Sequence, residues 1–566
     1  MAFQVSPGVS IKEIDATNVV PVTSSSVGGF AGAFNWGPIE EAVLVSSENE
    51  LAERFSTPDE SNYHHFLVAA SFLKYGNALR VVRSSGGDLK NARVGSGTAL
   101  LIKNESDYLT KTASALSTAG IFSARYAGSL GNSLKVHVVT NATSFAALSA
   151  ALQAELDGAP GNSPYATKYG LTGDELHIIV EDEDGLISGT KGQVLEVFPF
   201  LSQASDAKKA DGESIFYKDV INARSEYIWW GGHSSDLSDA GKKADGTEAL
   251  AGGGTAFDTH DTVIGGSLGG GVDETAYSTS ELQAAFNVLK DKATLDISLL
   301  FGAPDADGSK VMAEHLIDIA AERKDCLAFV SPPIADSVNG GASTVATYAG
   351  DIKSSSYGVI DSSAVYVYDK YSDVYRYIGA AGHIAGLCAQ TDKNQDAWFS
   401  PAGQNRGQLK GVVKLAYNPQ QADRDSLYKA RVNPLVSLPG QGTILFGDKT
   451  LLNRPSAFDR INVRRLFLAL EKSISSAAEA QLFEFNDEFT RAQFKNLVEP
   501  FLRDVKGRRG LTDFLVVCDE TNNTSQVIDS NKFVADIFVK PARAINFIQL
   551  NFVATRSGAE FTEIAG

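Results

Sequence analysis

Residues 511–523 read LTDFLVVCDETNN, which predicts a strand over Leu511–Glu520 and a turn at its end. Two amphipathic helical segments precede this stretch, and an apolar strand pattern, Phe533–Val553, follows it. The chain then ends in a polar tail with spaced apolar residues, Thr555–Gly566. This order predicts a connecting domain that is edged by strands and does not resemble an active site. We expect the rest of the protein to be attached to it.

The two helices before this stretch have clear apolar faces. Apolar residues three and four apart predict the first helix over Arg460–Ile474. The second is predicted to be capped by Asn486 and kinked at Pro500, because proline cannot donate a backbone hydrogen bond. The last strand pattern, Ala544–Val553, is apolar on both faces, so we expect both faces to be covered.

The chain has 566 residues, which is too long for one hydrophobic core and indicates three or four domains. Its net charge of −18 argues against general binding of nucleic acid or anionic membranes. The stretch from Arg454 to Arg509, however, contains 11 Lys and Arg residues and only 8 Asp and Glu residues. That local excess predicts either a solvated helix pair or a contact surface for an acidic partner.

The three cysteines are far apart and have no metal-ligand spacing, which predicts buried free thiols in a reducing compartment. The N-terminus lacks the basic and apolar regions of a signal peptide, and no apolar run is long enough to span a membrane. We therefore expect the chain to fold in a cytoplasm.

The fold class is predicted to be α+β and multidomain, with a discontinuous α/β domain. Alternating strands and helices in 21–85 and 285–430 predict parallel β-α-β units interrupted by a mostly β, outward-facing insertion, 86–284. Within the first segment, Ser47 is the expected cap of a helix. Residues 1–20 form a predicted extended arm, because the short strand around Val9 and Ile11 has no hairpin partner nearby. A C-terminal α+β domain over 431–554 and an arm over 555–566 complete the division.

The stretch Gly442–Thr450 differs from a nucleotide-binding phosphate loop by one extra residue, Asp448. Asp448 displaces Lys449 from the position at which it would share the phosphates, and it adds a negative charge there. A nucleotide-binding α/β enzyme is therefore a weak alternative function.

The motif around Ser267 formally matches a hydrolase nucleophile, but glycines rather than a helix follow it. The pair His64-His65 predicts a surface or interface pair rather than a metal site, and His315 and His383 are expected to be satisfied buried histidines. No catalytic, cofactor or metal site is predicted.

Several blocks of the chain together resemble the contractile-tail sheath proteins of T-even-type phages. The resemblance is strongest after about residue 280 and weak across 86–284. The blocks are collinear and lie in Ser6–Glu13, Phe34–Pro38, Leu73–Arg83, Ile384–Asp392, Ser400–Gly403, Asn405–Gly407, Leu445–Thr450, Phe458–Phe467, Val517–Thr524, Pro541–Arg543 and Leu550–Thr555.

The resemblance implies a non-enzymatic structural subunit without a cofactor. In this family, six subunits form a ring around an inner tail tube, and the rings stack helically and contract to drive the tube through the host envelope for genome delivery. It implies as partners further copies of the chain, the tail tube protein, and baseplate and tail terminator proteins, with no nucleic acid and no membrane insertion. The expected location is the virion tail, after assembly in the host cytoplasm.

The resemblance also implies that the C-terminal domain lies innermost and that its sheet is completed by terminal arms of neighbouring subunits. The residues expected in this strand exchange are Val9, Ile11, Ile545, Phe547, Leu550, Phe552, Phe561 and Ile564. A possible tube contact is expected at Arg503, Lys506, Arg508 and Arg509. The sheath of a tailocin or another cellular contractile injection system is the alternative within the structural class.

Overall fold

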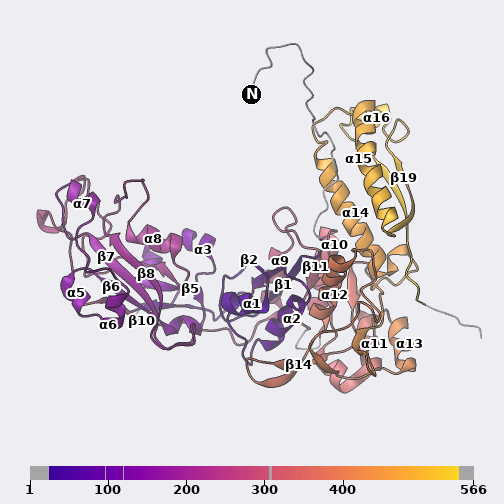
Figure 1. Cartoon of the computed structure of the whole chain (residues 1–566), viewed down its shortest axis with the longest axis horizontal. Coiled ribbons are helices and arrows are strands. Elements are labelled where there is room, and N and C mark those ends of the chain that lie inside the picture. The colour runs from indigo at the N-terminus through magenta and orange to yellow at the C-terminus, as the bar shows by residue number, and fades with distance from the viewer. Residues whose placement is uncertain (1–24, 96, 119, 305–308, 547–566) are drawn as a thin grey trace, which may run out of the picture. The chain divides into compact units, whose positions relative to one another are not determined.

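The computed structural model describes residues 25–95, 97–118, 120–304 and 309–546. These residues divide into two compact units (Figure 1). The C-terminal unit contains 395–400 and the described residues from 456 onward, and the main unit contains the described residues up to 394 together with 401–455. The division of the chain into five domain segments stays a prediction.

A six-stranded sheet forms the centre of the main unit, in the order β13-β12-β11-β1-β3-β2. All neighbouring strands are parallel except β2, which runs antiparallel to β3 at one edge. The strands are β1 (Gly28–Gly32), β2 (Ala42–Val45), β3 (Leu79–Arg83), β11 (Leu299–Phe301), β12 (Leu327–Val330) and β13 (Gly358–Ile360). Since β1 pairs with β11, this sheet joins the two segments that the sequence predicts to be halves of one α/β arrangement.

Helices pack on both faces of this sheet. Ala285 and Phe286 of α9, together with residues of α10, pack against Ala31, Leu300 and Ala328. On the other side Phe72 of α2 stacks on Phe301, with ring centroids 5.2 Å apart. The helices of this region are α1 (Glu48–Phe55), α2 (Tyr63–Leu73), α9 (Thr279–Val288), α10 (Val311–Arg323), α11 (Gly341–Asp351) and α12 (Ala381–Asn394). Ser47 caps α1 as predicted, because its Oγ accepts the backbone N–H of Glu50 at 3.2 Å.

The insertion contains a seven-stranded antiparallel sheet in the order β8-β7-β6-β10-β4-β5-β9. Its strands are β4 (Asn91–Val94), β5 (Phe122–Ala127), β6 (Leu134–Val139), β7 (Glu175–Asp182), β8 (Gln193–Ser202), β9 (Ile228–Trp230) and β10 (Ile264–Gly269). Short helices also occur, namely α3 (Glu105–Thr110), α4 (Ala113–Thr118), α5 (Ala142–Ala146), α6 (Ala150–Ala154), α7 (Pro164–Lys168) and α8 (Tyr217–Arg224). The seven-stranded sheet agrees with the β character predicted for 86–284, but the short helices contain nearly as many residues as the strands, so the region is mixed rather than mostly β.

The rest of the main unit is built from two small sheets and one helix. A three-stranded sheet has the order β15-β14-β16, and its β14–β15 hairpin is the one that the alternating tyrosines predict. The elements are β14 (Val365–Asp369), β15 (Val374–Ile378), β16 (Val412–Leu415), α13 (Gln421–Lys429), β17 (Leu435–Leu438) and β18 (Gly442–Leu445).

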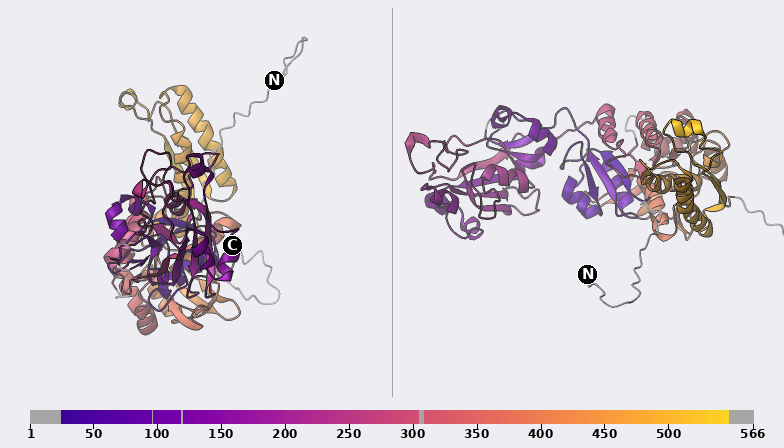
Figure 2. Two further views of the ribbon diagram at one scale, coloured as in Figure 1. Left: turned by 90° about the vertical axis from the view of Figure 1, so that its left-hand side faces the viewer. Right: turned by 90° about the horizontal axis from the view of Figure 1, so that it is seen from above.

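The described part of the C-terminal unit contains two long helices, one short helix and a two-stranded sheet (Figures 1 and 2). Its elements are α14 (Ile461–Glu479), α15 (Glu488–Gly507), β19 (Leu511–Val517), α16 (Ser525–Asp529) and β20 (Asp536–Pro541). Leu466 of α14, Val498 and Leu502 of α15, and Val516 of β19 share one hydrophobic core. The helices therefore cover one face of the sheet.

Two details of this unit differ from the expectations, and a third stays untested. The cap of α15 is Asp487 rather than Asn486, because the Asp487 carboxylate accepts the N–H of Thr490 at 2.8 Å. Helix α15 continues through Pro500, and Asn496, the residue whose carbonyl loses its partner, is exposed to water. The kink expected at Pro500 stays a prediction. Within the described residues the final apolar run does not form one strand, because β20 ends at Pro541 and residues 542–546 belong to no strand.

Candidate functional site

The Gly442–Thr450 stretch does not have the geometry of a phosphate loop. Its first residues form strand β18 rather than a glycine loop before a helix. The Lys449 ammonium donates to the carbonyl of Tyr428 at 2.8 Å and lies 3.8 Å from the centroid of the Tyr428 ring. Lys449 is thus a packing residue that joins this loop to α13.

Ser267 is placed inside a strand rather than on a strand-to-helix turn. It lies in the middle of β10 and pairs in register with Lys135 of β6. A hydrogen bond from Ser267 and an ion pair with Lys135 hold the pKa of Glu183 below its usual range. The serine therefore stabilises a carboxylate on the sheet surface.

The histidines are packing residues of the main unit. The expectation of a surface pair is wrong for His65, which is buried beside Phe30, and burial lowers the pKa of His64 to about 4. His383 is buried, and burial lowers its pKa to about 3; its Nδ1 lies 3.0 Å from the Tyr75 hydroxyl. Its Nε2, like one ring nitrogen each of His65 and His315, has no partner among the described residues, so these histidines are only partly satisfied. Within the described ranges, no group of His, Cys, Asp or Glu is arranged to hold a metal ion.

All three cysteines, Cys326, Cys388 and Cys518, are buried and free, as predicted. Burial raises the pKa of the Cys326 thiol to about 12, so this thiol is a packing group. No helix in the described part of the chain is long and apolar enough to cross a membrane.

The β19–β20 sheet exposes an apolar face. Leu515 and Phe538 are cross-strand partners, and they are 56% and 59% exposed. Their neighbours Val516 and Ile537 point to the opposite, covered face, as strand alternation requires. Two large apolar side chains thus stand together on a sheet face that no helix among the described residues of this unit covers.

Both strands of this sheet also have a free edge among the described residues, since each has a single hydrogen-bonded neighbour. Beyond β20, Ile545 is 81% exposed and belongs to no strand. The other residues expected in strand exchange lie outside the described residues, and these are Val9, Ile11, Phe547, Leu550, Phe552, Phe561 and Ile564. An edge with unpaired N–H and C=O groups is a template for a strand from another chain.

A second exposed apolar surface lies where α14 turns into α15. We call it the aromatic tip and define it by Leu482, Phe483, Phe485, Phe489, Ile528 and Phe533, all exposed. The last two come from the β19–β20 connection, which Asn486 ties to this turn by donating to the carbonyl of Lys532 at 2.8 Å. Sequence reasoning missed this surface, although phenylalanines in an acidic turn between two helices are a visible signal.

The four residues of the expected tube contact lie together at the opposite end of α15, which we call the basic end. Lys506 pairs with Asp513 at 3.2 Å, and Arg508 pairs with Asp396 and, at 3.7 Å, with Asp504. Arg503 and Arg509 are exposed and have no ion pair with any described residue. The structure thus brings the four cations together and leaves two of them unneutralised.

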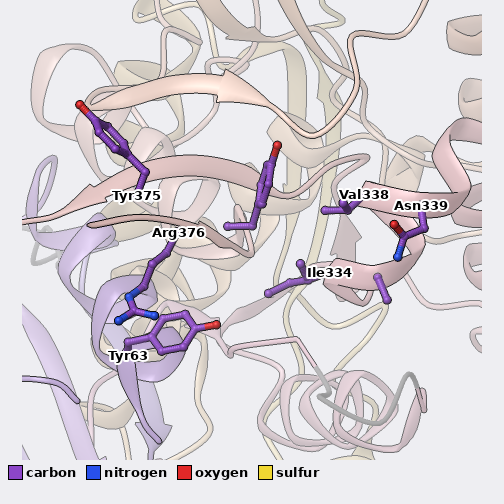
Figure 3. A pocket seen from close by; sticks show the side chains of 8 residues that line it. Tyr63, Ile334, Val338, Asn339, Tyr375 and Arg376 are labelled. Atoms are coloured by element: carbon purple, nitrogen blue, oxygen red, sulfur yellow. The ribbon is translucent and has the colours of Figure 1, made fainter. Parts of the chain in front are cut away.

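The β15-β14-β16 sheet of the main unit presents tyrosines on one face. Tyr366 pairs with Tyr377 and Tyr368 pairs with Tyr375 across the hairpin. Beside the free edge of β15 lies an open groove of about 450 Å³ (Figure 3). Arg376 points towards Tyr63 in this groove, 4.2 Å from its ring centroid, and its Nε donates to the buried carboxylate of Asp369 at 3.0 Å. Clustered tyrosine and arginine are typical of protein interfaces rather than of catalytic sites.

Comparison with known proteins gives consistent results over the whole chain. Residues 289–451 match the phage tail sheath protein central domain, and residues 453–555 match the phage tail sheath C-terminal domain. The tail sheath proteins of Vibrio phage KVP40 and Enterobacteria phage T4 are each 32% identical, and the alignments cover 99% of this chain and 99% of each relative. The crystal structure of a sheath tail protein from Listeria innocua has a similar fold, with a TM-score of 0.53 at 10% identity, over 92% of this chain and 96% of that one. The chain therefore belongs to the family of contractile phage tail sheath proteins.

Proposed function

We propose that this sheath subunit forms hexameric rings around the tail tube, that the rings stack helically, and that terminal arms link them by strand exchange. The incomplete β19–β20 sheet carries the proposal, because it exposes Leu515, Phe538 and two free edges in the described part of the chain. A two-stranded sheet alone is marginally stable in water and gains by adding strands.

The arms supply the missing strands by β-augmentation. In the N-terminal arm Val9 and Ile11 alternate with Ser10 and Lys12, which is the pattern of a strand with one apolar face. Main-chain hydrogen bonds give such a joint its affinity, and alternate side chains give it register. Because the joint involves only terminal segments, the linked subunits keep freedom to rotate while the rings stay connected.

Contraction in this proposal needs no nucleotide. The extended sheath is metastable, and contraction releases free energy as the α/β regions of adjacent rings gain contacts. Tube and sheath then act as one machine that drives the tube through the host envelope for genome delivery. Observation of ATP-dependent contraction by the purified sheath would contradict this step.

The further partners follow from position in the tail. The C-terminal domain lies innermost, the insertion faces outward, and baseplate and tail terminator proteins contact the two ends of the sheath. The basic end of α15 binds an acidic partner in this proposal. The sequence predicts that this partner is the tail tube. The subunit assembles in the host cytoplasm; the sheath of a tailocin or another cellular contractile injection system is the alternative setting.

Electron microscopy of the purified chain in negative stain tests the proposal. We expect tubes or stacked rings at high concentration. Deleting residues 1–20 or 556–566 should leave folded protein that does not polymerise. A sharper variant is Val9→Asp/Ile11→Asp, with Ser10→Asp on the opposite strand face as its matched control. Normal tubes from the deletion variants would refute strand exchange.

A further inference from the structure

The aromatic tip is an apolar surface held in a costly conformation. Phe483 is fully exposed and has a positive φ of 71°, in the left-handed region that bulky residues rarely adopt. Leu482, Phe485 and Phe489 are 63%, 83% and 75% exposed in the same turn. Exposed apolar residues clustered in this way mark a contact surface.

The tip is also strongly acidic. Its two turns carry seven carboxylates and one lysine, namely Glu479, Glu484, Asp487, Glu488, Asp519, Glu520, Asp529 and Lys532. None of the seven has an ion pair with a described residue. The helix dipole explains acids only in the first turn of α15, which are Asp487 as the cap and Glu488. Asp519 closes its own turn by accepting hydrogen bonds from the N–H and the hydroxyl of Thr521. The other four carboxylates have neither role among the described residues of the unit.

The basic end has the complementary character. Lys540 and Arg543, which lie where β20 ends, add to Arg503, Lys506, Arg508 and Arg509. Three carboxylates, Asp396, Asp504 and Asp513, neutralise only half of these six cations. Trp398 adds an aromatic surface, since its ring centroid lies 5.4 Å from the Arg508 guanidinium. Trp and Arg are the side chains that most often dominate binding energy at interfaces.

The tip and the basic end cannot meet within one chain. They lie at opposite ends of the 20-residue helix α15, which separates them by about 30 Å at 1.5 Å per residue. Only another molecule can bring an acidic aromatic surface to the basic end, and a second copy of this chain carries one.

We propose that the aromatic tip of one copy docks on the basic end of the next, in addition to the strand exchange. This inference rests on the proposed self-assembly and identifies the acidic partner of the basic end as this chain rather than the tail tube. Because the two surfaces differ, the contact is head-to-tail, and repeated contacts of this kind close a ring or extend a helix. The phenylalanines supply apolar contact, and the opposite charges set direction and partner choice.

A charge-swap experiment on the full-length chain without tube protein tests the proposal. The tip variant is Glu479→Lys/Glu484→Lys, and the basic-end variant is Arg503→Glu/Arg509→Glu. A third variant combines all four changes, and a fourth, Phe483→Ser/Phe485→Ser, removes apolar contact without changing charge. The matched control for the tip variant is Glu155→Lys/Asp157→Lys, two exposed positions of the insertion. The assembled fraction is measured by sedimentation and electron microscopy at low and high salt.

Each of the two charge variants should lower the assembled fraction at least tenfold at low salt, whereas the combined variant should return it to within about threefold of the unmodified chain. The serine variant should also lose assembly, and the control should assemble normally. Failure of the combined variant to recover, or normal assembly of the serine variant, would overturn the tip contact alone. A parallel assay adds purified tubes, and loss of assembly confined to that assay would assign the basic end to the tube instead. If the unmodified chain forms no rings or tubes, the proposed function fails as well.

Discussion

The six-stranded sheet of the main unit and the two-stranded sheet of the C-terminal unit differ in how completely their apolar faces are buried. In the first, helices pack on both faces, and central residues such as Phe30 and Phe301 are completely buried. In the second, helices cover one face, and Leu515 and Phe538 remain exposed. The difference shows where the described chain completes its own core and where it leaves apolar side chains uncovered.

The largest effect is expected inside the six-stranded sheet. Phe301→Ala should cost about 3–5 kcal/mol of stability, because it leaves a cavity between Phe30 and Phe72. Leu44→Ala, on edge strand β2 where the side chain is 47% exposed, should cost less than about 0.5 kcal/mol. Calorimetric unfolding of both variants checks this. If the two variants lost equal stability, the six-stranded sheet would not have the fully buried centre described above.

A pH effect of comparable size is expected at the carboxyl end of β13. Asp361 is buried there, where Ser331 and the N–H of Ser363 donate to its carboxylate, and burial raises the pKa of Asp361 to about 7. A folded-state pKa above the unfolded value of 3.8 means that the folded protein holds an extra proton between these pH values. Stability is therefore highest at low pH within this window and falls by up to about 4 kcal/mol as pH rises to 7.

The variant Asp361→Asn isolates this contribution, because the amide does not titrate. The difference in unfolding free energy between the unmodified protein and the variant should change between pH 4 and 7 and be constant above pH 8. A difference that stays constant from pH 4 to 8 would show that the Asp361 carboxylate keeps an ordinary pKa.

The smallest effects are expected on the two faces of β19. Val516→Ala on the covered face should cost about 2 kcal/mol, because it removes buried methyl groups from the helix–sheet core. Leu515→Ala on the open face should change stability by less than about 0.5 kcal/mol, because the side chain is exposed. It should reduce assembly if the proposed strand exchange covers this face. Thermal midpoints of the dissociated chains and sedimentation of the assembled ones separate the two effects. If Leu515→Ala lost stability but still assembled normally, the open face of β19 would belong to the core of the chain and not to a contact between chains.

Local patterns predicted much of this molecule. The Ser47 cap, the tyrosine hairpin and the two long C-terminal helices depend on neighbours in sequence, so they are visible without the fold. The family resemblance could also be identified from collinear blocks of residues. The aromatic tip, by contrast, was missed because exposure of an apolar residue depends on what the rest of the chain fails to cover.

The sequence by itself determined the family of the protein and the alternation of strands and helices in its two α/β segments. Only the tertiary structure decided the order β13-β12-β11-β1-β3-β2, the burial of His65 and the separation of acidic and basic surfaces to opposite ends of α15. The physical reason is the distance along the sequence between the residues that interact. Caps, periodicity and turn residues act over a few positions, whereas strand order, burial and surface charge arise from contacts between residues hundreds of positions apart, such as Gly28 with Leu299.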